Sequence, residues 1–124
     1  MKKLIFACLL ATAAASAFAE WTKLGESDAE TFYIDYKSVR KDGDLRKVWE
    51  IQDKKQRLDG GAISIRSRTE YDCKAERWKL LSFSAFSERM ASGKTLISDD
   101  SPDAWSDIPP DSAAMRISKI VCAQ

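Results

Sequence analysis

Cysteine is the residue type in this chain best suited to specific chemistry. Cys73 lies in the stretch "YDCKAERWKL", Cys122 lies near the C-terminus, and Cys8 lies in an apolar N-terminal segment. A cysteine can attack a substrate, bind a metal ion or form a disulfide. A structural zinc site takes about four Cys or His ligands, and a cysteine nucleophile usually relies on a neighbouring histidine. The sequence contains no histidine, which favours the disulfide and predicts neither a catalytic group nor a metal site.

The N-terminal residues predict export. The stretch "MKKLIFACLLATAAASAFAE" combines two lysines, an apolar run and an Ala17-Phe18-Ala19 cleavage signal, a pattern typical of a secretory signal peptide over residues 1–19. Its removal takes Cys8 with it and leaves one domain, residues 20–124. The cell exterior and the periplasm are oxidising, so Cys73 and Cys122 are expected to form a disulfide there.

The charges are close to balanced but unevenly distributed. Without the leader's Lys2 and Lys3, the 20 basic residues become 18, against 19 acidic ones, a net charge of −1. A nearly neutral domain has no general attraction for nucleic acid or anionic membrane. Residues 37–79, however, carry thirteen basic and eight acidic groups. No stretch approaches the roughly 20 apolar residues of a spanning helix, so we predict no transmembrane segment.

Period-two alternation predicts a sheet of about six strands. In "ISIRSRTEYDC" (residues 63–73) the odd-numbered positions are mostly apolar and the even-numbered ones are polar or charged, which places Cys73 on the apolar face. "RWKLLSFSAF" (77–86) is apolar at both parities, which indicates a central strand or one with a bulge. The other predicted strands are residues 21–25, 31–36, 45–52 and 95–98, and Asp42-Gly43 predicts a tight turn before the third of these.

The C-terminal residues predict a helix. "PPDSAAMRISKIVCAQ" begins with prolines and offers Asp111 or Ser112 as N-cap, followed by good helix formers with an apolar stripe at helical spacing. Strands followed by one terminal helix predict an α+β fold. We expect an antiparallel sheet with this helix packed on one face and tied to it by the Cys73–Cys122 disulfide.

Two groups of residues are candidate binding surfaces. Arg66 and Arg68 lie on the charged face of the strand at 63–73, where they could contact an acidic glycan or protein. The alternative is a solvated face whose charges pair with one another, as alternating signs usually do. The second group is the segment "SDDSPDAWSDIPPD", whose candidates are Asp99, Asp100, Asp103 and Trp105.

The acidic segment lacks the D-x-D-x-D-G pattern of a calcium loop, so no bound ion is expected. Recognition residues concentrate on loops, and this loop is therefore a candidate partner contact. The sequence has four tryptophans. Large aromatic residues generally fill the core of a small domain, and Trp105, placed among turn-forming residues, is the one expected at the surface.

Several stretches together resemble the bacterial surface-adhesin protein E family. These are "YIDYKSVRKDGDLRKVW", "RSRTEYDCKAERWKLLS", the later Trp105, Pro109, Pro110 and Ser112, and the closing "IVC". The resemblance implies a sheet of about six antiparallel strands with a C-terminal helix fastened by a disulfide. It also implies adhesion to host matrix glycoproteins such as vitronectin and laminin, dimerisation, and haem binding. Because histidine, the commonest haem ligand, is absent here, we predict no cofactor.

The sequence therefore predicts an exported, non-enzymatic cell-envelope protein that binds another protein. Serines are plentiful, but no histidine can serve as their base and no G-x-S-x-G motif occurs. Adhesion to host matrix glycoproteins is the favoured function, and the expected location is the periplasm or the outer cell surface. The alternative is a periplasmic structural or accessory protein with a bacterial partner and no adhesive role.

Overall fold

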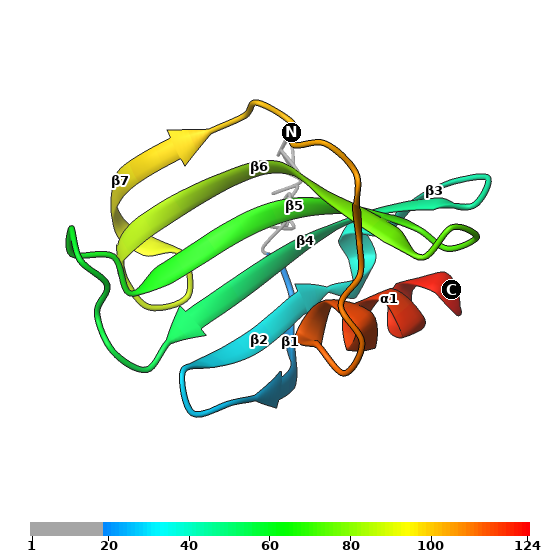
Figure 1. Ribbon diagram of the computed structural model, residues 1–124. Helices are drawn as coiled ribbons and strands as arrows, with labels where there is room; N and C mark the ends of the chain where they lie inside the picture. Colours follow the sequence, from blue (N-terminus) through cyan, green and yellow to red (C-terminus); the bar gives the residue numbers. More distant parts are fainter. Residues whose placement is uncertain (1–18) are drawn as a thin grey trace, which may run out of the picture.

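The computed structural model describes residues 19–124, which form a strongly curved antiparallel sheet and one helix (Figure 1). The predicted signal peptide, apart from Ala19, and Cys8 lie outside the described residues. The strands are β1 (Trp21–Glu26), β2 (Glu30–Asp35), β3 (Arg40–Asp42), β4 (Leu45–Lys54), β5 (Ser64–Asp72), β6 (Arg77–Glu88), β7 (Ser92–Asp99) and β8 (Ser106–Asp107). The helix is α1 (Ala113–Cys122), and a short 3-10 turn spans Tyr36–Ser38.

The six predicted strands are confirmed and are consecutive neighbours in the sheet. The order is β1-β2-β4-β5-β6-β7, with every pair antiparallel. Two short strands were not predicted: β3 pairs with β4, and β8 pairs with β6. The Asp42-Gly43 turn is confirmed, because Asp42 pairs with Leu45 and Gly43 has a φ of 57°. Glycine adopts this left-handed conformation without steric cost.

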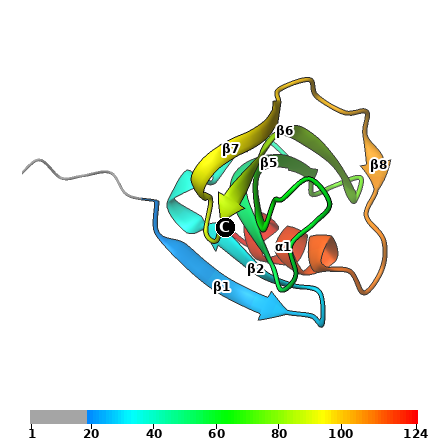
Figure 2. The ribbon, with the colours of Figure 1, turned by 90° about the vertical axis from the view of Figure 1, so that its left-hand side faces the viewer.

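The sheet curls around the helix, as the view along the strands in Figure 2 shows. Register irregularities in three strand pairs contribute to the curvature, because a bulge increases the local twist. One of them lies opposite Arg68 and Thr69, where the partners on β6 are Ser82 and Leu80 and Leu81 is left over. The bulge predicted for this strand is therefore present.

The concave side, here called the inner face, holds the helix and the main core. Ser112 caps the helix, since its Oγ accepts a hydrogen bond from the Met115 backbone N–H at 3.1 Å. The apolar side of the helix packs on the inner face of the sheet. The buried core consists of Ile34, Val48, Tyr71, Ile108, Ala114, Ile117 and Val121.

The predicted disulfide joins the end of β5 to the last residue of the helix. The Cα atoms of Cys73 and Cys122 lie 5.7 Å apart, 49 positions apart in sequence. Between them run β6, β7 and residues 100–112, here called the connecting segment, which crosses in front of the sheet in Figure 1. The cross-link therefore closes a loop that contains nearly half of the described chain.

The connecting segment follows the edge of β6 before it reaches the helix. The Asp103 backbone N–H donates to the Leu80 carbonyl at 2.9 Å, and the Ile108 N–H donates to the Glu76 carbonyl at 3.2 Å. Between these bonds, β8 pairs with Arg77 and Trp78. These bonds hold the connecting segment along the same edge of β6 that β7 pairs with farther along the strand.

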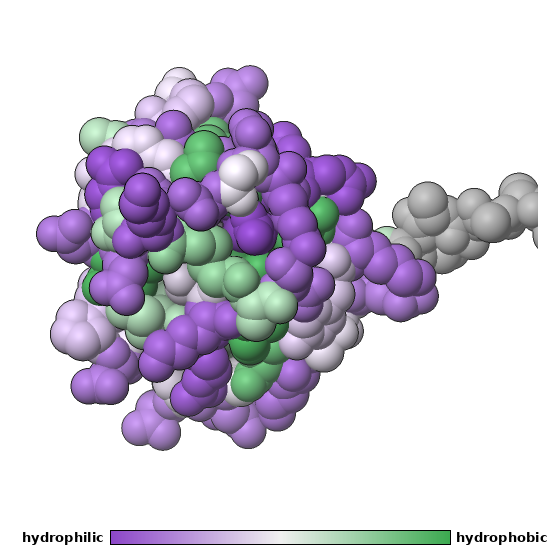
Figure 3. Space-filling view, turned by 90° about the vertical axis from the view of Figure 1, so that its right-hand side faces the viewer, coloured by the Kyte–Doolittle hydropathy of each residue, from purple (hydrophilic) through white to green (hydrophobic). Residues whose placement is uncertain are grey.

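The opposite face of the sheet, here called the outer face, is less exposed than alternation alone predicts. Glu70 and Asp72 are buried, and Arg66 and Arg68 are half-buried. Side chains from neighbouring strands cover much of this face. On the side that carries the β3–β4 hairpin and the C-terminus, hydrophilic residues predominate and the hydrophobic ones gather mainly in the middle (Figure 3). No helix within residues 19–124 is long and apolar enough to span a membrane.

Replacing both bonded cysteines, Cys73→Ser with Cys122→Ser, should lower the free energy of unfolding by about 4 kcal/mol, because the unfolded chain regains the entropy of a loop of about 50 residues. Urea denaturation of the variant and of the wild type measures this difference. Wild-type protein reduced with dithiothreitol should show the same loss. A decrease in the free energy of unfolding of about 1 kcal/mol or less would mean that apolar contacts alone suffice to hold α1 against the sheet.

Candidate functional site

The two candidate arginines lie side by side on the outer face, over aromatic rings. Arg66 and Arg68 are two residues apart on β5, so both side chains point to the same side of the sheet. The Arg66 guanidinium lies 5.5 Å from the Trp49 ring centre and 5.3 Å from that of Phe86. The Arg68 guanidinium lies 5.8 Å from the Trp49 ring centre. Trp49 is directly opposite Arg68 in the β4–β5 register, so the pairing of strands creates this cluster.

The other charges of the outer face behave as the solvated-face alternative predicted. Glu70 pairs with Lys47 at 4.0 Å and with Lys79 at 3.5 Å, and the Asp72 carboxylate accepts from Arg77 at 3.0 Å. Within residues 19–124, by contrast, no carboxylate lies within salt-bridge distance of Arg66 or Arg68.

An arginine over an aromatic face gains about 0.5–1 kcal/mol at an exposed site, and its hydrogen-bond donors stay free for a partner. The guanidinium groups of Arg66 and Arg68 are thus held in place by rings while their charge remains uncompensated.

Trp105 also lies under cations. The Lys79 Nζ is 4.6 Å and the Arg77 guanidinium 5.1 Å from its ring centre. Its half-buried position differs from the exposed one expected for a loop tryptophan, because β8 pairs with β6 and brings the ring next to two long basic side chains. Lys79 links the Trp105 site to Glu70, two residues beyond Arg68 on the same face.

The structure separates the acidic candidates. Asp99 and Asp100 border a shallow hollow that includes Ser82 and Ser84; these serines are the register partners of Arg68 and Arg66. The two aspartates are separated from the arginines by β6, and Asp99 is the register partner of Phe83, whose side chain lines the inner face. Asp103 instead lines a pocket on the inner face. No group of three or more His, Cys, Asp or Glu side chains in the described part of the chain is arranged to hold a metal ion.

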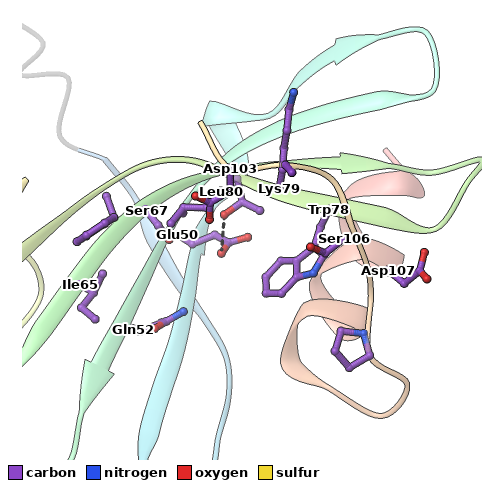
Figure 4. A pocket seen from close by; sticks show the side chains of 14 residues that line it. Glu50, Gln52, Ile65, Ser67, Trp78, Lys79, Leu80, Asp103, Ser106 and Asp107 are labelled. Carbon is purple, nitrogen blue, oxygen red and sulfur yellow. Dashed lines mark hydrogen bonds between the residues drawn. The ribbon is translucent and has the colours of Figure 1, made fainter. Parts of the chain in front are cut away.

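A pocket of about 540 Å³ opens on the inner face between the sheet and the connecting segment. Its walls are largely apolar and include Ile65, Trp78, Leu80, Phe83, Ala104 and Pro109. Polar side chains of β4 and β5, namely Glu50, Gln52 and Ser67, lie on its floor. Figure 4 shows Glu50 among the strands and Trp78 next to the helix. The helix fills one end of the curved sheet, and the pocket occupies the part that the helix leaves uncovered.

Glu50 is a buried carboxyl without a cation beside it. It is 4% exposed; the Tyr71 hydroxyl donates to its Oε1 at 2.5 Å, and the Thr69 hydroxyl donates to its Oε2 at 3.3 Å. Burial raises the pKa of Glu50 to about 7, although both hydrogen bonds act in the opposite direction. Burial, and then the neighbouring Glu50, also raise the pKa of the Tyr71 hydroxyl well above its ordinary value.

Sequence reasoning missed the aromatic partners of the arginines and the buried acid. The expectation that the tryptophans other than Trp105 fill the core holds for Trp78, which packs against it, but is wrong for Trp49, which lies on the outer face. Alternation along "VWEIQ" could have shown that Trp49 and Glu50 point to opposite faces. Alternation could not show which residues of the neighbouring strands lie beside Trp49 and Glu50, because that depends on the register of strand pairing.

The fold and its surfaces define a class: a small, disulfide-bonded α+β domain whose curved sheet carries a cation–aromatic row on one face and a pocket on the other. The sequence profile of the family described as Surface-adhesin protein E matches residues 21–123. The chain therefore belongs to the surface-adhesin protein E family, as the resemblance indicated. Among curated proteins, none matches the sequence significantly.

Solved structures of Haemophilus influenzae protein E share the fold. Crystal form II of that protein aligns with a TM-score of 0.63 at 15% identity, covering 82% of this chain and 96% of the other. The protein from a non-typeable strain aligns with a TM-score of 0.59 at 15% identity, covering 84% of each chain. At this identity the likeness establishes a common architecture.

The buried carboxyl predicts a pH dependence of stability. Because the pKa of Glu50 rises from an ordinary value of 4.5 to about 7 on folding, the folded protein binds more protons than the unfolded one between these values. Stability should therefore be highest, as far as Glu50 is concerned, below about pH 4.5 and fall by about 3 kcal/mol as the pH rises through 7.

The substitution Glu50→Gln should remove this component, because glutamine keeps the shape of the side chain but does not ionise; its amide oxygen can still accept one of the two hydroxyl hydrogen bonds, and its NH2 group can donate to the other hydroxyl oxygen. Urea denaturation of both proteins from pH 4.5 to 8 measures it as the difference between the two curves. A constant difference across this range would show that Glu50 titrates normally.

Proposed function

We propose that this protein is an exported, non-enzymatic adhesin that binds a host matrix glycoprotein through the outer face of its sheet. The observation that carries the proposal is the pair of uncompensated guanidinium groups of Arg66 and Arg68, fixed over Trp49 and Phe86. Arginine and tryptophan dominate the energetics of protein interfaces. A partner that presents carboxylates could form bidentate hydrogen bonds with both arginines.

Membership of an adhesin family supports a matrix glycoprotein as the partner, with vitronectin and laminin as the first candidates. Asp100 and Trp105 extend the proposed surface on the side of β6. Asp99 pairs with Phe83 on the inner side and Asp103 faces the pocket, so both are left out of it. Guanidinium groups that are already positioned lose less conformational entropy on binding, so a rigid row of this kind suits recognition.

The proposal includes a homodimer. Every residue of the edge strand β7 is exposed, and Ile97 is 60% exposed. A long exposed edge with apolar side chains is a template for pairing with another strand. A second copy that pairs there would extend the sheet and present two outer faces to one partner molecule.

The double variant Arg66→Gln with Arg68→Gln should weaken binding to immobilised laminin or vitronectin at least about tenfold, which corresponds to about 1.4 kcal/mol. Glutamine retains part of the aliphatic stem over the rings but removes the charge. Surface plasmon resonance measures the affinity, and thermal unfolding checks that the fold is intact. The matched control is Lys41→Gln with Lys119→Gln, which removes the same charge from exposed residues of β3 and α1. Equal affinities of wild type and arginine variant would contradict the proposed surface.

The alternative, a periplasmic accessory protein with a bacterial partner, differs in location. If the protein acts as an adhesin, brief protease treatment of intact cells should remove it while a periplasmic marker stays intact. Immunoblotting of treated and lysed cells measures this. Complete protection in intact cells, with digestion after lysis, would favour the periplasmic alternative and exclude direct adhesion.

A further inference from the structure

The pocket on the inner face has the properties of a small-molecule site and lies on the face opposite the proposed adhesive surface. Its volume of about 540 Å³ falls within the range of roughly 300–1,000 Å³ that is typical of ligand sites. Such sites combine apolar walls with a few convergent polar groups. Here Trp78, Leu80 and Phe83 supply walls, and Glu50, Gln52 and Ser67 supply the polar floor.

The floor has unused hydrogen-bonding capacity. Tyr71 and Thr69 each donate one hydrogen bond to Glu50, whereas a carboxylate has about four acceptor positions. No charged nitrogen within residues 19–124 lies within salt-bridge distance of Glu50. A buried charge without a partner is costly, and a core of apolar residues would be more stable at this position. The carboxyl lines an open pocket, so a cation can reach it.

The remaining charged groups around the pocket are already engaged or lie at its margin. Lys79, at the rim, pairs with Glu70 and lies over Trp105. Glu30, on β2, pairs with Lys54 in an adjoining hollow that shares Glu50, Gln52, Trp78 and Pro109 with the pocket. Asp103 and Asp107 belong to the connecting segment and leave the entrance acidic. The electrostatics of entrance and floor therefore both favour a positive ligand.

We propose that this pocket binds a small organic cation, an amine or guanidinium group on an apolar or aromatic body, with the Glu50 carboxylate as its counterion. The cationic group lies at Glu50, where Gln52 and Ser67 supply further acceptors. The body packs between Trp78, Leu80 and Phe83, and the adjoining hollow toward the N-terminus of α1 accommodates a longer one. Binding requires ionised Glu50, so a proton leaves this carboxyl when the cation enters at a pH near or below 7.

The test uses three probes of similar shape: 2-phenylethylamine, 2-phenylethanol and 3-phenylpropionate. Titration of the oxidised protein at pH 8, followed by calorimetry and by NMR shifts of Trp78 and Ile65, should show the amine binding at least tenfold tighter than the alcohol. The acid should bind weakest. At pH 5.5 the advantage of the amine should fall at least tenfold, because the cation then has to displace a proton. Equal affinities of amine and alcohol at pH 8, or amine-induced shifts confined to Trp49 on the outer face, would overturn the proposal.

Two variants locate the counterion. Glu50→Gln should abolish the advantage of the amine and leave the affinity for the alcohol unchanged. Asp103→Asn with Asp107→Asn, which alters only the entrance, should keep most of that advantage. If the advantage of the amine survived in Glu50→Gln but was lost in the double aspartate variant, the cation would lie at the entrance and the role of Glu50 would be contradicted. The wild-type titration stands by itself should either variant fail to fold. The proposed binding of laminin or vitronectin involves the opposite face of the sheet. The result of that binding assay is therefore independent of the result of the amine titration.

Discussion

The fastening of the C-terminal helix to the sheet is the constraint on which the pocket and the position of Trp105 depend. Cys73 directly follows β5 and Cys122 ends α1, so the bond between them fixes where the helix lies on the inner face. The connecting segment, which leads to this helix, runs along β6 and is hydrogen-bonded to it. Its course positions Trp105 beside Lys79 on one side and closes the pocket above Glu50 on the other. One cross-link thus determines the surroundings of a residue on each face.

The two faces of the sheet hold their charges by different means. On the outer face, aromatic rings orient the guanidinium groups while solvent still hydrates them, and such contacts contribute modestly to stability. On the inner face, Glu50 lies where hydration is lost and only two hydroxyl groups compensate it. Its raised pKa is the consequence of that loss. The outer arrangement suits a large partner that approaches a rigid surface, and the inner one suits a small cation that enters a pocket.

The periodic elements could be predicted from the sequence because their signals are local. Alternation along residues 63–73, the turn at Asp42-Gly43 and the Ser112 cap depend on neighbours only a few positions away. The site could be predicted only in part. Arg66 and Arg68 were found from their parity, but their partner Trp49 is set by the β4–β5 register, which no local pattern specifies. Trp105 was expected at the surface because it lies among turn-forming residues. The adjacent strand β8, which brings it next to Lys79, has only two residues and gives no alternating signal. Glu50 was not predicted as a site residue, because the sequence does not show which face of the sheet the helix covers.

The most direct test of this account is hydrogen exchange of the native protein with the disulfide intact and after reduction. If the bond fixes the helix and through it the connecting segment, reduction should sharply lower the protection of amides in α1 and of the Asp103 and Ile108 amides, which donate to β6. The central strands β4 and β5 should keep most of their protection. Equal protection of the helix and the connecting segment in both states would contradict the account, because their positions would then not depend on the bond.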